Sequence, residues 1–187
     1  MSPGDLLILL AFVGALAATA LFVPALRGRK SGLAGWVFAG HAVLLVASLA
    51  LLWWLFLTHR FEYDYVAQYS SRALSPALTF AASWAGQEGS ILLWVTLAAL
   101  LGMALLRQPG VLTRPAMFFV SLLQSLMMML LLVRSPFRLS AVVPQDGQGL
   151  NPLLEDPWMV VHPPVLFLGY AALALPFALG LAALVRQ

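Results

Sequence analysis

The sequence predicts an all-α membrane protein with about five transmembrane helices, an amino terminus outside the membrane and a short outer interfacial helix. Hydrophobic residues make up 62% of the chain, charged residues only 9%, and the mean hydropathy is +0.94. A soluble domain of this size cannot bury so much apolar surface. The apolar runs are also too long for membrane strands and lack their alternating pattern, so we expect helices.

Five apolar runs are long enough to cross a hydrocarbon layer about 30 Å thick. The predicted spans are Leu6–Leu26, Ala34–Leu57, Ser90–Leu106, Ala116–Val133 and Val165–Val185. The third and fourth runs are close to the shortest length that can span. We treat residues 1–187 as a single transmembrane helical domain.

The basic residues predict the orientation of the helices. Arg27, Arg29 and Lys30 follow the first span, Arg107 and Arg114 lie between the third and fourth spans, and Arg186 follows the fifth. The positive-inside rule places them in the cytoplasm, so the amino terminus and the connectors 58–89 and 134–164 are expected outside. The first run has no cations before it, unlike a cleavable signal sequence. We therefore predict a multi-pass protein of the cytoplasmic (inner) membrane with an extracytoplasmic functional face.

The first outer connector is rich in aromatic residues. Ser75-Pro76 is typical of a helix start, and we predict a short helix from Ser75 to about Trp84 in the membrane interface. The simplest interpretation of the connector's other aromatics is an anchoring belt at the headgroup layer. These aromatics are Phe61, Tyr63, Tyr65 and Tyr69.

The segment from Trp84 to Trp94 leads into the third span. Its Glu88 is expected at the amino-terminal end of that helix, where free N–H groups favour a carboxylate. One interpretation is that Glu88 only matches the helix dipole. The other is that Trp84, Glu88 and Trp94 form a ledge for a planar ligand.

The second outer connector carries Arg134 and Arg138, whose guanidinium groups could bind cofactor carboxylates or, more simply, lipid phosphates and nearby acids. The proline-bounded segment Asn151–Pro157 predicts a turn before His162. Because proline disfavours helical backbone in the residue before it, we expect His162 to be extended and Pro164 to begin the fifth helix.

Histidine supplies the only strong metal-ligand candidates, because the chain has no cysteine. His162 is predicted at the outer water boundary, where it either binds a metal or cofactor or is merely solvated. His59 is interpreted as a belt residue, and His41 as a neutral side chain bonded to a neighbouring helix. No zinc, nucleotide or hydrolase motif is present, and no basic stripe favours nucleic acid.

Four motifs in order resemble those of one family. They are Trp84–Trp94 (WAGQEGSILLW), Ser135-Pro136-Phe137, Asn151–Pro157 (NPLLEDP), and His162-Pro163-Pro164 with Gly169-Tyr170. Together they resemble the amino-terminal part of CcmF, the membrane subunit of the bacterial cytochrome c haem lyase in the haem-handling protein superfamily. The resemblance covers essentially the whole chain.

The resemblance implies a function, a cofactor and partners. A protein of this family would accept haem from a CcmE-like haem chaperone outside the membrane and oversee thioether attachment to an apocytochrome c bearing CXXCH. CcmH- or CcmI-like haem lyase subunits would be further partners, beside membrane lipid. His162 matches the first of two external histidines that flank the haem site, which makes it the expected axial ligand. The tryptophan-rich segment, the second external histidine and the transmembrane haem ligands of the family lie beyond this point, so the chain alone is expected to be inactive.

Two other functions stay open at this stage. A transporter or channel for haem or another solute would need polar residues along several spans and discontinuous helices. A structural assembly subunit would tolerate substitution of Trp84, Glu88 and His162.

Overall fold

The computed structural model describes all 187 residues as a bundle of helices without strands. The helices are α1 Pro3–Leu26, α2 Ala34–Leu57, α3 Asp64–Tyr69, α4 Pro76–Ala82, α5 Gln87–Leu106, α6 Thr113–Val133 and α7 Trp158–Val185, with one 3₁₀ turn at Pro152–Leu154. Helices α1, α2, α5, α6 and α7 are long and apolar enough to cross a membrane. The predicted fold class is confirmed.

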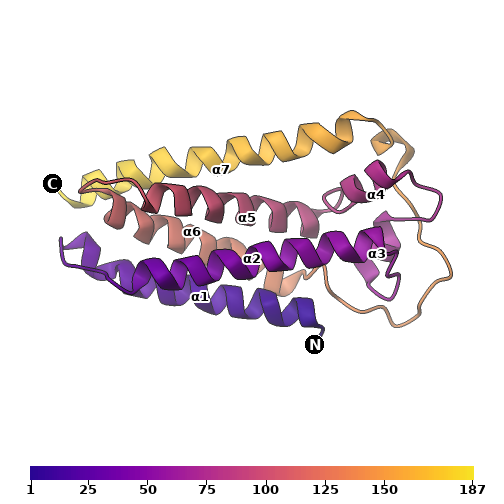
Figure 1. The fold of residues 1–187 in the computed structure, drawn as a ribbon, viewed down its shortest axis with the longest axis horizontal. Helices are drawn as coiled ribbons and strands as arrows, with labels where there is room; N and C mark the ends of the chain where they lie inside the picture. The colour runs from indigo at the N-terminus through magenta and orange to yellow at the C-terminus, as the bar shows by residue number, and fades with distance from the viewer.

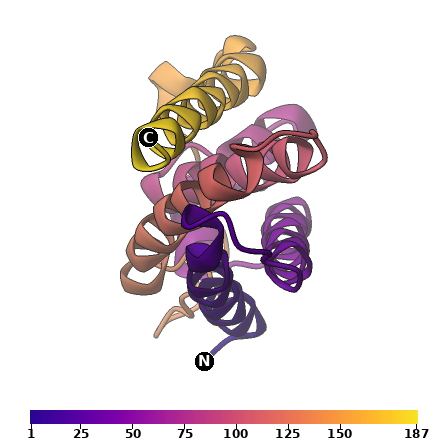
Figure 2. The ribbon, with the colours of Figure 1, turned by 90° about the vertical axis from the view of Figure 1, so that its left-hand side faces the viewer.

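The long helices run side by side (Figure 1). Helices α5 and α6 lie in the middle of the bundle, with α7 on one side and α1 and α2 on the other (Figure 2). The amino terminus, α3, α4 and the 134–157 connector gather at one end, which we call the His162 end. The carboxyl terminus and the connectors 27–33 and 107–112 lie at the other, the arginine end (Figure 1). This arrangement separates the two ends as the sequence predicts.

The third and fourth spans are longer than predicted because each helix begins three residues earlier. Helix α5 has Gly86 as its N-cap and includes Gln87 and Glu88 in its first turn. Helix α6 begins at Thr113, with Pro115 in its first turn, where a missing N–H breaks no helical hydrogen bond. At 20 and 21 residues, both helices reach the usual spanning length.

The predicted extended backbone at His162 is wrong. Helix α7 begins at Trp158 and continues through His162, Pro163 and Pro164. The prolines keep a helical φ, so the local preference of the residue before proline is overcome by the rest of a 28-residue helix. Their missing N–H groups leave the carbonyls of Met159 and Val160 without helical donors.

Small residues bring α1 close to its neighbours. Ala11, Ala15 and Ala18 are fully buried, as expected where transmembrane helices pack closely. Next to them, Nδ1 of His41 lies 2.7 Å from the carbonyl oxygen of Ala11. Nδ1 must carry the proton in this contact, because a carbonyl oxygen can only accept. The predicted interhelical bond of His41 is therefore confirmed.

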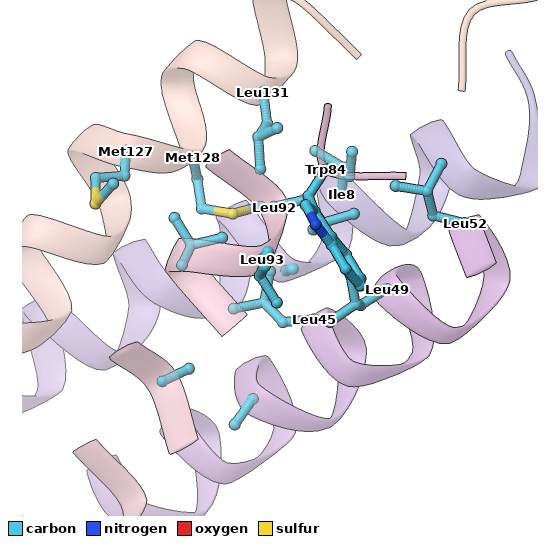
Figure 3. Close-up of a cluster of buried hydrophobic side chains, with 14 of the residues drawn as sticks. Ile8, Leu45, Leu49, Leu52, Trp84, Leu92, Leu93, Met127, Met128 and Leu131 are labelled. Atoms are coloured by element: carbon cyan, nitrogen blue, oxygen red, sulfur yellow. The ribbon is translucent and has the colours of Figure 1, made fainter. Parts of the chain in front are cut away.

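The buried apolar core runs along the bundle and includes Trp84, which Figure 3 shows among aliphatic side chains. The indole shares one buried cluster with Leu49 of α2 and Leu93 of α5. Met127 and Met128 are buried in the same cluster, whereas the next residue, Met129, is exposed.

Three contacts anchor the connector that follows α6. Ser135 Oγ donates to Asp5 Oδ1 at 2.6 Å, and the Phe137 ring is fully buried against Gly4 in the first turn of α1. Beyond them, Leu139 pairs with Tyr63 in an antiparallel bridge. The Ser135-Pro136-Phe137 motif thus fastens the 134–157 connector to the amino terminus.

Burial corrects the interpretation of the aromatic belt. Phe61 and Tyr65 are 3% and 4% exposed and belong to the core, while Tyr63 and Tyr69 are partly buried. The Tyr65 ring packs against those of Phe56 and Tyr69, and the Phe61 ring against that of His59. The sequence alone did not indicate these contacts. The predicted short helix is confirmed as α4, with Ser75 Oγ accepting the N–H of Leu78. Its location in the membrane interface stays a prediction.

Gly4→Ala is expected to destabilise the protein by about 1–3 kcal/mol, because a Cβ at this position would overlap the Phe137 ring at 2.1 Å. Gly40→Ala is the matched control, since a Cβ on Gly40 meets nothing within 4 Å. Thermal unfolding of the detergent-solubilised protein measures both. Equal melting temperatures for the two variants would contradict the packing of Phe137 on Gly4.

Candidate functional site

The start of α7 is held by an unusual hydrogen bond. The indole Nε1–H of Trp84 donates to the carbonyl oxygen of Met159 at 2.9 Å. That carbonyl is free because its helical donor would be the N–H of residue 163, which is a proline. Trp84 therefore replaces the missing hydrogen bond and connects the segment before α5 to the first turn of α7.

The turn before α7 is organised by its own polar side chains. Asn151 Oδ1 accepts the N–H of Leu153, and Asp156 Oδ1 accepts the N–H of Trp158, the first residue of α7. The predicted turn is present, and it delivers the chain to His162 one turn later.

His162 is exposed on this rigid support. Its imidazole makes no hydrogen bond to the rest of the chain, and it lines a shallow hollow of about 200 Å³. The other lining residues are Leu153, Leu154, Asp156, Trp158, Met159 and Pro163. An unengaged imidazole among mostly apolar side chains can ligate a metal in a planar cofactor whose edge enters the hollow.

Aromatic side chains shape the turn into α5. The Tyr65 hydroxyl accepts the N–H of Gly86 at 3.0 Å and donates to the carbonyl of Ser83 at 3.2 Å. A Cβ on Gly89 would lie 1.8 Å from the Ser83 carbonyl oxygen, so only glycine fits there. On the other side of the turn, Ser90 Oγ donates to the Trp84 carbonyl at 2.7 Å.

Charge and burial both act on the tyrosines of this turn. Burial raises the pKa of the Tyr65 phenol far above its usual value, so the hydroxyl stays protonated and keeps both hydrogen bonds. Burial, followed by the nearby charge of Glu88, raises the pKa of Tyr69. Glu88 therefore lies close to two uncharged tyrosine side chains, those of Tyr65 and Tyr69.

A cavity of about 720 Å³ lies between the two connectors. Glu88, Asp64, Arg134 and Arg138 line it, with Tyr65 and several polar side chains. Neither arginine forms an ion pair, because the only salt bridge of the protein joins Arg60 to Glu62. The guanidinium groups are thus available to a carboxylate or another anion.

The predicted site residues fall into separate places. Glu88 and Arg138 share the large cavity, whereas His162 lines the smaller hollow beside α7. Trp84 is only 4% exposed and acts through its hydrogen bond to α7 instead of forming an open ledge. Trp94 is half-buried deeper in the bundle, with its ring centroid 5.7 Å from that of Tyr170 and 6.3 Å from that of Phe167 on α7.

The other histidines lie elsewhere. His59 follows α2 with a φ of 51° and packs against Phe61. His41 is inside the bundle, and no cluster of three or more potential ligand residues exists. The sequence did not indicate the roles of Tyr65 and Met159, although the proline four residues after Met159 marks a carbonyl without a helical partner.

Comparison with known proteins finds a family model described as "Cytochrome C assembly protein" that matches residues 84–187. Across 97% of its length the chain is 35% identical to the cytochrome c-type biogenesis protein CcmF of Pseudomonas aeruginosa. Across 80% it is 37% identical to the probable cytochrome c-type biogenesis protein NrfE of Escherichia coli. A solved structure of the cytochrome c haem lyase CcmF superposes with a TM-score of 0.78 over 98% of the chain, at 27% identity. The chain spans 28–30% of the length of these proteins.

Trp84→Phe is expected to destabilise the start of α7 by about 1–2 kcal/mol, because the Met159 carbonyl loses its donor. Trp53→Phe is the control: both indoles pack on Phe80, but Nε1 of Trp53 has no partner. Hydrogen exchange of residues 158–165 should rise in the first variant alone. Similar protection in both variants would show that the indole N–H does not hold α7.

Tyr65→Phe is expected to cost about 1–3 kcal/mol, because it leaves a buried N–H and a buried carbonyl unpaired. Tyr69→Phe should change stability little, since the Tyr69 hydroxyl makes no hydrogen bond to the chain. Chemical denaturation in detergent distinguishes them. A Tyr65→Phe protein as stable as Tyr69→Phe would argue against this role of the hydroxyl.

Proposed function

The chain belongs to the cytochrome c assembly protein family, and we propose that it is the haem-handling, amino-terminal part of a cytochrome c haem lyase. In this proposal the His162 end faces the outside of the cytoplasmic membrane. Its partners there are a haem chaperone, an apocytochrome c with a CXXCH motif and other lyase subunits. Haem held at this end would present its vinyl groups to the two thiols of the apocytochrome.

The observation that carries the proposal is the state of His162. The imidazole is exposed, unengaged and fixed on the first turns of α7 by the Trp84–Met159 hydrogen bond. A ligand that need not break existing contacts or reorganise its backbone can bind iron with little ordering cost. We therefore assign His162 as an axial ligand.

The chain offers one such ligand and leaves the rest of the site to other residues. No second histidine lies in the hollow with His162. One face of α7 is also unpartnered: Leu166 and Gly169, one and two turns beyond His162, are exposed. Since the relatives are more than three times longer, we propose that their remaining helices cover this face and complete the haem site.

Trp84 and Arg138 take different parts in this proposal. Trp84 positions α7 and thereby the imidazole. Arg138, with Glu88, lies in the cavity between the connectors. For Arg138 to bind a propionate of the same haem, the cofactor would have to extend from the α7 hollow to that cavity. Trp94 packs against Phe167 and Tyr170, which follow His162 on α7, and so supports the helix that carries the proposed ligand.

Transport through this bundle finds less support. The long helices are continuous, and hydroxyls such as those of Ser48, Thr96 and Ser121 donate to carbonyls of their own helices. The amide of Gln124 on α6 donates to the Val95 carbonyl on the neighbouring α5. The polar groups within the spans are therefore mostly engaged in packing and do not line a path.

His162→Ala in the complete protein is expected to lower the yield of holo-cytochrome c by at least about tenfold, as loss of a ligand-bonded group commonly does. Its melting temperature should stay within a few degrees of the parent, because the side chain is exposed and unbonded. Haem-stained cytochrome c in membranes measures the yield, and immunoblotting checks the amount of the variant.

Two controls separate this effect from general damage. Val161→Ala changes an exposed neighbour on α7, and His59→Asn removes an imidazole at the same end while keeping a residue that tolerates positive φ. Both should mature cytochrome c normally. Full maturation by His162→Ala as well would contradict the proposed ligand, and a structural assembly role would then be favoured.

A further inference from the structure

The arginine end of the bundle contains a cavity that the proposed function does not use. It measures about 500 Å³ and lies where the ends of α1, α6 and α7 meet. Arg29, Lys30, Arg114 and Arg186 line it, together with Gly28, Ser31 and a few small or apolar residues. In Figure 2, this end of the bundle faces the viewer.

No acidic side chain neutralises these four cations. The acidic residues of the chain are Asp5, Glu62, Asp64, Glu88, Asp146, Glu155 and Asp156, and all belong to the His162 end. The only ion pair, Arg60 with Glu62, also lies there. All four side chains are exposed, and their positive charges together favour the binding of an anion at this cavity.

Two of the arginines lie against other residues of the cavity. Arg114 Nη1 donates to the carbonyl oxygen of Ser31 at 3.0 Å and contacts Ser31 Oγ at 3.2 Å. The Arg186 guanidinium lies over Gly28, where a Cβ would be 3.2 Å from Nη1. Gly28 has a φ of 72°, which glycine adopts without strain. Ser31 thus holds the Arg114 guanidinium at the cavity by hydrogen bonds, and the absence of a side chain on Gly28 leaves room for that of Arg186.

Backbone N–H groups are a second kind of donor at this cavity. The N–H groups of Lys30, Ser31 and Gly32 donate to no backbone carbonyl. Free N–H groups beside guanidinium forks match the several acceptor oxygens of a phosphate.

The depth of the cavity identifies the source of the phosphate. It lies at the ends of the spanning helices, and the exposed Val111 lines it. Two more exposed apolar side chains, Leu33 and Trp36, lie at the same end of the bundle, at the start of α2. Exposed tryptophan and aliphatic side chains next to basic residues are typical of the boundary between acyl chains and headgroups. A lipid phosphate is already present at that depth, whereas a free phosphate would have to enter from water.

We propose that this cavity binds the headgroup of an anionic phospholipid at the arginine end of the bundle. Basic pockets between transmembrane helices commonly bind such headgroups. The general preference for basic residues at one membrane face would explain the number of cations at this end. It would not explain why four of them line one cavity, where hydrogen bonds hold Arg114. With four cations available, a lipid with two phosphates is expected to bind more tightly than a lipid with one.

Native mass spectrometry of the purified complete protein tests the proposal, with cardiolipin, phosphatidylglycerol or phosphatidylethanolamine added in detergent. The double variant Arg29→Gln/Arg186→Gln is expected to lower the apparent cardiolipin affinity by about tenfold. The matched control, Arg27→Gln/Arg107→Gln, removes the same charge at the same end from residues that do not line the cavity, and should lower it less than about threefold. Binding should follow the order cardiolipin, phosphatidylglycerol, phosphatidylethanolamine.

Three results would overturn the proposal. Equal losses in the two double variants would indicate a diffuse charged surface, and equal binding of phosphatidylethanolamine would exclude recognition of net negative charge. Displacement of cardiolipin by millimolar inorganic phosphate would identify a free-anion site instead of a lipid site.

Discussion

One hydrogen bond, from the indole of Trp84 to the carbonyl of Met159, joins the parts of the His162 end. It exists because Pro163 cannot supply the helical donor that the Met159 carbonyl would otherwise receive. A helix containing two adjacent prolines would be weakest where the imidazole must be held most rigidly. The indole restores a hydrogen bond there and anchors the helix to the aliphatic core, of which Trp84 is itself a member.

The same bond connects two distant motifs of the sequence. Trp84 lies in the turn before α5, where the Tyr65 hydroxyl bonds to Ser83 and Gly86. Met159 precedes His162 by three residues. A displacement of the turn would therefore reach the imidazole through a single contact. This gives a physical reason why tryptophan, glycine and proline occur together with histidine in a chain whose remaining sequence is mostly apolar.

The fold was largely predictable because membrane spans depend on length and hydropathy, which can be read directly from the chain. All five spans and α4 lie where the apolar runs and Ser75-Pro76 predict them. The start of α7 was not predictable from local rules, because the preference of a residue before proline favours extended backbone at His162. The donor that compensates one of the two carbonyls freed by these prolines comes from Trp84, 75 residues before Met159 in the sequence.

Local sequence rules also fail to predict the packing of the two outer connectors. Tyr65 and Phe61 are aromatic residues of the kind found in a membrane belt, yet both are buried. Tyr65 is packed beside Gly86, 21 residues away in the sequence, and Phe61 lies near Gly147 of the other connector. Neither contact has a local signal in the sequence. For the candidate site, the sequence predicted that His162 lies at the same end of the bundle as the two long connectors, which the structure shows. It also grouped His162 with Arg138, which lines another cavity.

The most direct test of the account is the absorption spectrum of haem bound to the complete protein carrying His162→Gly, recorded with and without added imidazole. If His162 ligates iron from α7, the substitution should shift the Soret band, and imidazole should restore the parent spectrum by occupying the vacated position. An unchanged spectrum in the variant would contradict the assignment of His162 as an axial ligand.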